Sequence, residues 1–176
     1  MYEATEDASL IPSDPPKSFT YKKDKYVLTD KQWDSYKEAR GQAAFDGITK
    51  LIENADYQNA DETVQAQMIK DVWSYADKVG RTAIIPDYDL GTVSPDPIAQ
   101  IAKDAKVKGH ENEMVKALNR SDYEAYEAMV QALYDDGVED KDIKSKINDT
   151  YRDAWKDAYK RNDTPRMVEI EEMLYH

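Results

Sequence analysis

The stretch from Leu28 to Ile85 decides the fold, because it holds the two clearest helical patterns in the sequence. It opens Leu28-Thr29-Asp30-Lys31-Gln32-Trp33 and runs on to Val72-Trp73-Ser74-Tyr75-Ala76-Asp77-Lys78-Val79. Thr29, followed three residues later by Gln32, predicts a capping box at the start of a helix. We therefore expect two amphipathic helices joined by a short turn.

The first of these helices has one broad apolar face. Its members recur at helical spacing: Trp33, Tyr36, Ala44, Ile48, Leu51 and Ile52. Gly41 and Gly47 lie inside the helix, where each costs up to about 1 kcal/mol relative to Ala. We expect both glycines to permit close approach of another helix.

The second helix is predicted to start at Asn59 as N-cap, with Glu62 at the third helical position. Its apolar stripe steps by three or four residues: Val64, Met68, Val72, Tyr75 and Val79, widened by Ile69, Trp73 and Ala76. A stripe of this kind is typical of a buried core rather than of a ligand site.

Proline-rich segments mark the ends of this first lobe. Residues 1–26 contain Pro12, Pro15 and Pro16 and no helical period, which predicts an irregular arm. The aromatic residues Phe19, Tyr21 and Tyr26 either pack the end of the arm against the body or bind a partner. Residues 86–97 begin and end with proline, and we expect a linker loop there between two lobes.

The second lobe, residues 98–176, is predicted to hold four helices. Asp96-Pro97 starts a short helix that should end near Gly109, and Ser121 with Glu124 predicts another capping box. The apolar faces that follow are Tyr126, Met129, Val130, Leu133 and Tyr134; then Ile143, Ile147, Tyr151, Ala154, Trp155 and Ala158; then Val168, Ile170 and Leu174 after Asp163-Thr164-Pro165. Gly137 suits a C′ position.

The expected fold is all-α, with about six amphipathic helices in two helical-hairpin lobes, 27–85 and 98–176. The lobes resemble each other loosely, since Lys31–Tyr36 parallels Ser121–Tyr126 and each opens a helix. Duplication and convergence of two amphipathic hairpins both explain that likeness.

Residues suited to catalysis or metal binding are scarce. The chain has no Cys, and His110 and His176 are its only histidines, which argues against thiol chemistry, a His-based metal cluster and a catalytic triad. Asp87-Tyr88-Asp89-Leu90-Gly91 lacks the later oxygen ligands of a calcium loop and is interpreted as a turn. Leu133–Ile143 has the cadence of a helix-turn-helix, but its acidic turn favours a structural corner. We expect no enzyme activity, cofactor or metal.

Charge is the most informative property of the sequence. The formal net charge is −12, and residues 121–176 carry 15 acidic against 8 basic residues, a net charge of −7. Such a field opposes phosphate backbones and anionic lipid, so we expect no direct nucleic-acid or membrane binding. A basic protein surface is the favoured partner, and a merely solubilising role is the alternative.

The candidate partner-binding residues lie in this acidic half. They are Asp122, Glu124, Glu127, Asp135, Asp136, Glu139 and Asp140, together with Tyr134. Carboxylates on helices can imitate the spacing of DNA phosphates and occupy a basic nucleic-acid channel, while tyrosines among them supply aromatic anchors.

The segment Leu28-Thr29-Asp30 … Tyr36 … Gly41-Gln42-Ala43 … Leu51-Ile52 … Tyr57 … Ile69 … Tyr75-Ala76 resembles a helical module of large polyvalent and virion-internal proteins of Firmicutes tailed phages. Residues 121–174, with Gly137-Val138 … Ile143 … Tyr151 … Ala158 … Asn162-Asp163, resemble the segment that often follows it. The resemblance implies a phage protein and no catalytic residues. Family members carry the module inside much longer chains, so a 176-residue chain starting at Met1 is expected to be a separate copy.

Small acidic phage proteins are often stoichiometric inhibitors of host defence, anti-CRISPR proteins among them. We therefore expect a non-enzymatic protein that binds a basic surface of a host enzyme such as an RNA-guided nuclease in the host cytoplasm, with DNA mimicry as one mode of binding. The alternative is a virion-internal, assembly or ejection protein that binds other virion proteins.

Overall fold

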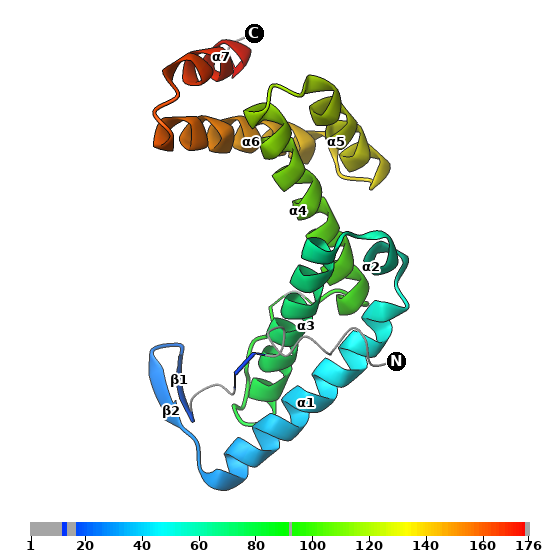
Figure 1. The fold of residues 1–176 in the computed structure, drawn as a ribbon. Coiled ribbons are helices and arrows are strands. Elements are labelled where there is room, and N and C mark those ends of the chain that lie inside the picture. The colour runs from blue at the N-terminus through cyan, green and yellow to red at the C-terminus, as the bar shows by residue number, and fades with distance from the viewer. Residues whose placement is uncertain (1–11, 14–16, 92, 175–176) are drawn as a thin grey trace. The chain divides into compact units, whose positions relative to one another are not determined.

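The protein is built from seven helices and one hairpin in the part of the chain that the structure, a computed structural model, describes: residues 12–13, 17–91 and 93–174. The elements are β1 (Ser18–Tyr21), β2 (Asp24–Val27), α1 (Asp30–Ile52), α2 (Ala55–Asn59), α3 (Glu62–Thr82), α4 (Pro97–Asn119), α5 (Tyr123–Asp135), α6 (Asp140–Lys160) and α7 (Thr164–Leu174), as Figure 1 shows. The predicted all-α class with about six helices is confirmed.

The chain divides into two compact units, Met1–Ala105 and Lys106–His176, and the division falls inside α4. The sequence instead suggested a boundary in the loop 86–97. The predicted end of a short helix near Gly109 is wrong, because α4 continues to Asn119. Ala102 packs in the core of the first unit and Met114 in that of the second. This burial on both sides offsets the cost of about 1 kcal/mol of a glycine within the helix.

The first unit is organised by α1 and α3, which lie side by side (Figure 1). The capping box that starts α1 is confirmed: the Thr29 hydroxyl accepts from the Gln32 amide at 3.3 Å, and Gln32 Oε1 accepts from the Thr29 amide at 3.0 Å. The core consists of apolar side chains from α1, α2, α3 and the first turns of α4: Leu51, Tyr57, Met68, Ile69, Val72, Ile98, Ala102 and Ala105.

The two glycines of α1 differ in their surroundings. A Cβ at Gly47 would lie 2.7 Å from Val72 Cγ1 and 3.1 Å from Ile98 Cδ1, so the predicted close approach is confirmed there. A Cβ at Gly41 would meet nothing within 4 Å. The prediction for Gly41 is therefore wrong, since that face of α1 is exposed.

A short helix that the sequence did not predict lies between α1 and α3. Asn54 caps this helix, α2, by accepting from the Asp56 amide, and Asn59 is its last residue. Asp61 caps α3, because its carboxylate accepts from the amides of Thr63 and Val64 at 2.8 and 3.0 Å. The predicted N-cap at Asn59 is therefore wrong by two residues.

The irregular arm predicted over 1–26 is wrong for residues 18–26, which form an antiparallel β-hairpin with Val27; residues 1–11 and 14–16 lie outside the described residues. Packing of its aromatic side chains is confirmed. The Phe19 ring stacks on Tyr26 with centroids 5.6 Å apart, and the Tyr21 ring lies 4.7 Å from that of Tyr88. The Tyr21 hydroxyl also accepts from the Asp89 amide at 2.8 Å.

The second unit comprises the end of α4 with α5, α6 and α7. Its core combines apolar side chains of all four helices: Val107, Met114, Ala117, Leu118, Tyr126, Leu133, Ile143, Ala154, Ala158 and Ile170. Two residues predicted to lie on apolar faces are substantially exposed, Tyr134 by 45% and Val168 by 48%, and for these the prediction is wrong. Tyr134 lies at the edge of the apolar stripe of α5, whereas Val168, two residues before the buried Ile170, lies on the opposite side of α7.

The two ends of α5 test two further predictions. The capping box at Ser121 is wrong, because Asp122 is the N-cap and accepts from the Ala125 amide at 3.1 Å. Gly137 at the other end has φ +71°, and the amides of Gly137 and Val138 donate back to the carbonyls of Tyr134 and Leu133. This Schellman motif confirms Gly137 as C′.

A buried arginine joins three segments of the second unit. Arg166 of α7 is 6% exposed and donates to the Leu118 carbonyl at the end of α4 and to the Ser121 hydroxyl at 3.0 Å. It also forms an ion pair with Glu169. The Ser121 hydroxyl thus accepts from Arg166 instead of capping α5, and the N-cap lies one residue later, at Asp122.

Candidate protein interface

An exposed helix face without basic residues distinguishes the second unit. The sequence of α5 contains no Lys or Arg, and its outward side chains recur at steps of three and four residues. We define the α5 face by these exposed side chains: Glu124, Glu127, Gln131, Tyr134 and Asp135. Glu124 and Glu127 have no ion pair with any residue that the structure describes, so their charges are directed at solvent.

The neighbouring helix α6 is different, because its acids are neutralised along the helix. Asp149 pairs with Arg152 at 3.1 Å, and Asp153 pairs with Lys156 at 3.0 Å. Five acidic and six basic residues leave α6 with a net charge of +1. The acidity predicted for residues 121–176 is therefore concentrated on α5, its flanking turns and α7.

Two of the predicted site residues perform structural tasks. Asp122 caps α5, and Asp136 turns inward, with its side chain 12% exposed. The carboxylate of Asp136 lies 2.5 Å from Lys106 Nζ and 3.1 Å from His110 Nε2 of α4. This cluster fixes the end of α5 to α4, and no sequence pattern indicated it because its partners are about thirty residues away.

Three predicted residues meet at the turn between α5 and α6. The Tyr134 hydroxyl donates to Asp140 Oδ1 at 3.0 Å, and Lys144 Nζ lies 2.8 Å from Asp140 Oδ2. Hydrogen bonds from Lys144 and Tyr134 hold the pKa of Asp140 below its usual value. Glu139 precedes α6 and pairs with Lys141 at 3.0 Å. Asp140 and Glu139 therefore present less unpaired charge than the sequence suggested.

The last predicted residue, Asp135, stays on the α5 face and accepts from Gln131 Nε2 at 3.0 Å. Of the eight predicted residues, the structure thus brings Glu124, Glu127, Tyr134 and Asp135 onto one face. Asp122 and Asp136 lie at the two ends of α5, and Glu139 and Asp140 lie at the start of α6.

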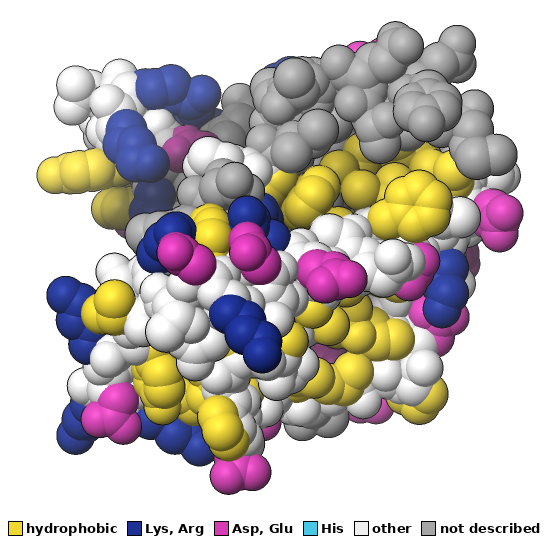
Figure 2. Space-filling view, turned by 90° about the horizontal axis from the view of Figure 1, so that it is seen from below, with side chains coloured by type: hydrophobic (Ala, Val, Ile, Leu, Met, Phe, Trp, Pro, Cys, Tyr) yellow, Lys and Arg dark blue, Asp and Glu magenta, His cyan; other side chains and the backbone are white. Residues whose placement is uncertain are grey.

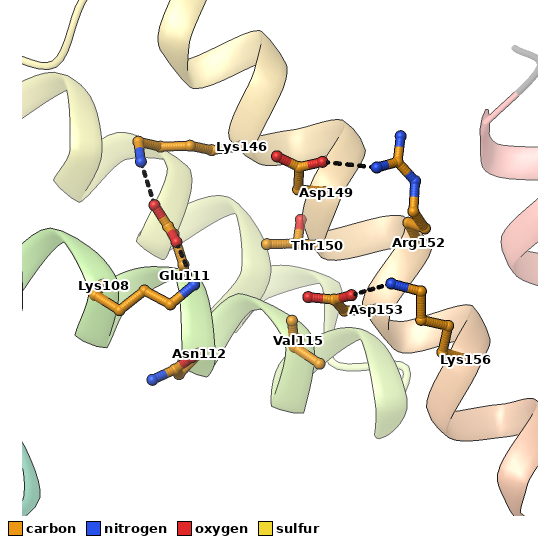
Figure 3. Close-up of a pocket in the computed structure, with 10 residues that line it drawn as sticks. All are labelled: Lys108, Glu111, Asn112, Val115, Lys146, Asp149, Thr150, Arg152, Asp153 and Lys156. Carbon is orange, nitrogen blue, oxygen red and sulfur yellow. Dashed lines mark hydrogen bonds and ion pairs between the residues drawn. The ribbon is translucent and has the colours of Figure 1, made fainter. Parts of the chain in front are cut away.

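A polar hollow of about 290 Å³ lies in the second unit between α4 and α6 (Figure 3). Glu111 lies against it with its side chain 13% exposed, paired with Lys108 at 2.8 Å and with Lys146. Burial opposes the ionisation of Glu111, but the two ammonium groups outweigh it and lower the pKa of that carboxyl. No sequence pattern predicted the ion pair of Glu111 with Lys146, which joins α4 and α6. Acidic and basic side chains nearly balance around the hollow, so we assign it no ligand.

Within residues 12–13, 17–91 and 93–174 there is no group of three or more His, Asp or Glu side chains placed to hold a metal ion. None of the helices described combines the length and the apolar content that crossing a membrane requires.

Comparison with known proteins identifies no relative: no family model, no curated protein and no solved structure matches the chain.

Proposed function

We propose that the protein is a non-enzymatic binding protein whose α5 face docks on a basic groove of a nucleic-acid-processing enzyme. The observation that carries the proposal is the unpaired charge of that face: Glu124 and Glu127 point outward on a helix that contains no basic residue. A rigid row of carboxylates competes with phosphates for a basic groove and releases the same condensed ions. The exposed Tyr134 supplies an aromatic contact beside the charges.

The resemblance to large proteins of tailed phages supplies the biological setting of the proposal. In that setting the partner is a host defence enzyme such as an RNA-guided nuclease. One copy of the chain binds one copy of the enzyme and blocks its nucleic-acid channel. The inhibitor would act in the host cytoplasm during infection.

Affinity capture with two matched variants tests the proposal. The tagged chain is compared with a Glu124→Lys, Glu127→Lys double variant and with an Asp149→Lys, Asp153→Lys control. Both variants change the net charge equally on exposed helix surface, but only the first alters the α5 face. We expect the chain and the control to retain the same nucleic-acid enzyme from infected host cells, and the α5 variant to lose it. Equal capture by all three would contradict the proposal.

A second function is favoured by the exposed aromatic residues of α6. The ring of Tyr159 is stacked on Trp155 with centroids 5.5 Å apart, yet Tyr159 remains 62% exposed. Such an aromatic surface suits a salt-insensitive contact between virion proteins. Capture of capsid, portal or ejection proteins that survives high salt and the Glu124→Lys, Glu127→Lys change would support this assembly role instead.

A further inference from the structure

The β-hairpin is a basic element in a strongly acidic chain. Residues 17–27 contain four lysines and one acid, a local net charge of +3, whereas the whole chain has a net charge of −12. Lys17 is paired with Asp30 at 2.8 Å. The other three lysines, Lys22, Lys23 and Lys25, are exposed and have no ion pair with any described residue. We call these three residues the hairpin tip.

The turn of the hairpin is built from two of these lysines. Lys22 and Lys23 have φ of +47° and +73°, and Asp24 pairs with Tyr21 directly across the turn. Two-residue turns of this kind favour Asn-Gly, because a side chain is strained at positive φ. The chain therefore holds two exposed lysines in a turn that other residues would form more easily.

The hairpin is held firmly to its own unit by the face that carries Phe19, Tyr21 and Tyr26. Phe19 stacks on Tyr26 and lies beneath the Arg81 guanidinium at 4.9 Å, while Tyr21 contacts Tyr88. The aromatic rings of the hairpin are thus engaged in contacts within the unit. Figure 2 shows Lys and Arg side chains gathered at the left of the molecule, the side on which the hairpin lies in Figure 1. Val27, on the opposite face of the hairpin, is 70% exposed.

We infer that the hairpin tip docks on the α5 face of a second copy of this chain. This inference rests on the proposed function, because it assigns a second occupant to the same docking face. Three lysines without an ion pair meet a helix face that carries Glu124, Glu127 and Asp135 and no basic residue. The exposed Val27 and Tyr134 add an apolar contact. Docking of this kind is head-to-tail, since different surfaces of the two copies meet.

Charge complementarity within the chain selects this occupant over nucleic acid. The acidic remainder of the chain repels both, but a nucleic acid is anionic along its whole length, whereas a second copy carries 24 basic residues among its 36 acidic ones. At an ionic strength of about 0.1 M the Debye length is about 10 Å. Repulsion between acidic surfaces farther apart than this is therefore screened more strongly than the attraction between charges in direct contact. A docked second copy then covers the α5 face until a partner with a more basic surface displaces that copy.

Two charge-reversed variants of the full chain test the inference by sedimentation velocity over a concentration series. The first is the Lys22→Glu, Lys23→Glu, Lys25→Glu variant, and the second is the Glu124→Lys, Glu127→Lys, Asp135→Lys variant. We expect the unaltered chain to sediment faster as its concentration rises, and each variant alone to lose that rise. An equimolar mixture of the two variants should regain it, because the reversed tip of one matches the reversed face of the other. Neither variant can misfold and still produce this recovery.

Several results would overturn the inference. They are a monomeric unaltered chain at every concentration, self-association that survives both reversals, and a mixture that stays monomeric. A chain that instead binds a labelled oligonucleotide through the hairpin tip would assign the tip to nucleic acid. Retention of the captured enzyme by the hairpin variant tests the proposed function separately, because that variant leaves the α5 face intact.

Discussion

Substituting each of the two glycines of α1 by alanine tests the packing of the first unit. Gly47 and Gly41 lie in the interior of the same helix, six residues apart, and both have ordinary helical backbone. A Cβ at Gly47 would lie 2.7 Å from Val72 Cγ1 and 3.1 Å from Ile98 Cδ1, and one at Gly41 would lie in open space. The pair therefore separates packing from helix propensity.

The expected magnitudes follow from these distances. Gly41→Ala gains helix propensity alone and should raise the free energy of unfolding by up to about 1 kcal/mol. Gly47→Ala gains the same amount but forces apart side chains of α3 and α4, and overpacking of a core costs about 1–3 kcal/mol. The two variants should therefore differ by about 1–3 kcal/mol, with Gly47→Ala the less stable.

Urea unfolding followed by far-UV circular dichroism measures the difference, and tryptophan fluorescence, which combines Trp33 and Trp73 of the first unit with Trp155 of the second, provides the other probe. Transitions that coincide for the two probes permit a single free energy for each variant. Equal stability of Gly41→Ala and Gly47→Ala, or a more stable Gly47→Ala, would refute the packing assigned to Gly47.

Three further predictions concern the second unit and the helix caps. Arg166→Met should lower the free energy of unfolding by about 2–3 kcal/mol, because the Leu118 carbonyl, the Ser121 hydroxyl and Glu169 all lose their contacts with a buried guanidinium. Arg152→Met on the exposed face of α6 should change it by less than about 0.5 kcal/mol in the same urea titration. Asp61→Ala should cost about 1 kcal/mol as the loss of a helix cap, and thermal unfolding should show a smaller change for Asn59→Ala. The lowered pKa of Glu111 stabilises the fold above the ordinary carboxyl pKa of 4.5, and this stability is lost as the pH falls through the lower folded-state value. The melting-temperature advantage of the unaltered chain over Glu111→Gln should therefore be complete near neutral pH and shrink on acidification below 4.5, and a constant difference would contradict the assignment.

Several features that depend on neighbours a few residues apart were predictable from the sequence, although the short helix α2 and the cap of α3 at Asp61 were not. The capping box at Thr29, the proline start of α4 after Asp96 and the C′ glycine at Gly137 all lie as the patterns indicated. Each rests on hydrogen bonds within one helical turn. The core positions Met68 and Val72 followed in the same way from helical periodicity.

Features that depend on distant partners were not predictable. Gly109 looked like a helix end, but the burial of residues on either side in two different cores carries α4 through it. Ser121 was predicted to cap α5, but its hydroxyl accepts a hydrogen bond from Arg166, 45 residues later in the chain. The hairpin was missed because Lys22-Lys23 lacks the Asn-Gly pattern that marks such turns.

The candidate site also combines features that were predictable from the sequence with features that depend on distant partners. Composition located the acidic half, but sequence alone did not separate Glu124 and Glu127, which are unpaired among the described residues, from Asp136, which pairs with a helix 30 residues earlier. That separation depends on which carboxylates meet cations in the folded chain. Partner binding by the α5 face stays a prediction.

Titration of the purified chain into a nucleic-acid cleavage assay of the captured enzyme tests whether the α5 face inhibits that enzyme. We expect cleavage to fall to its end point near one equivalent of the chain and to recover as the salt concentration is raised, and we expect the Glu124→Lys, Glu127→Lys variant not to inhibit. Full cleavage in the presence of excess chain, or equal inhibition by that variant, would contradict the proposed function.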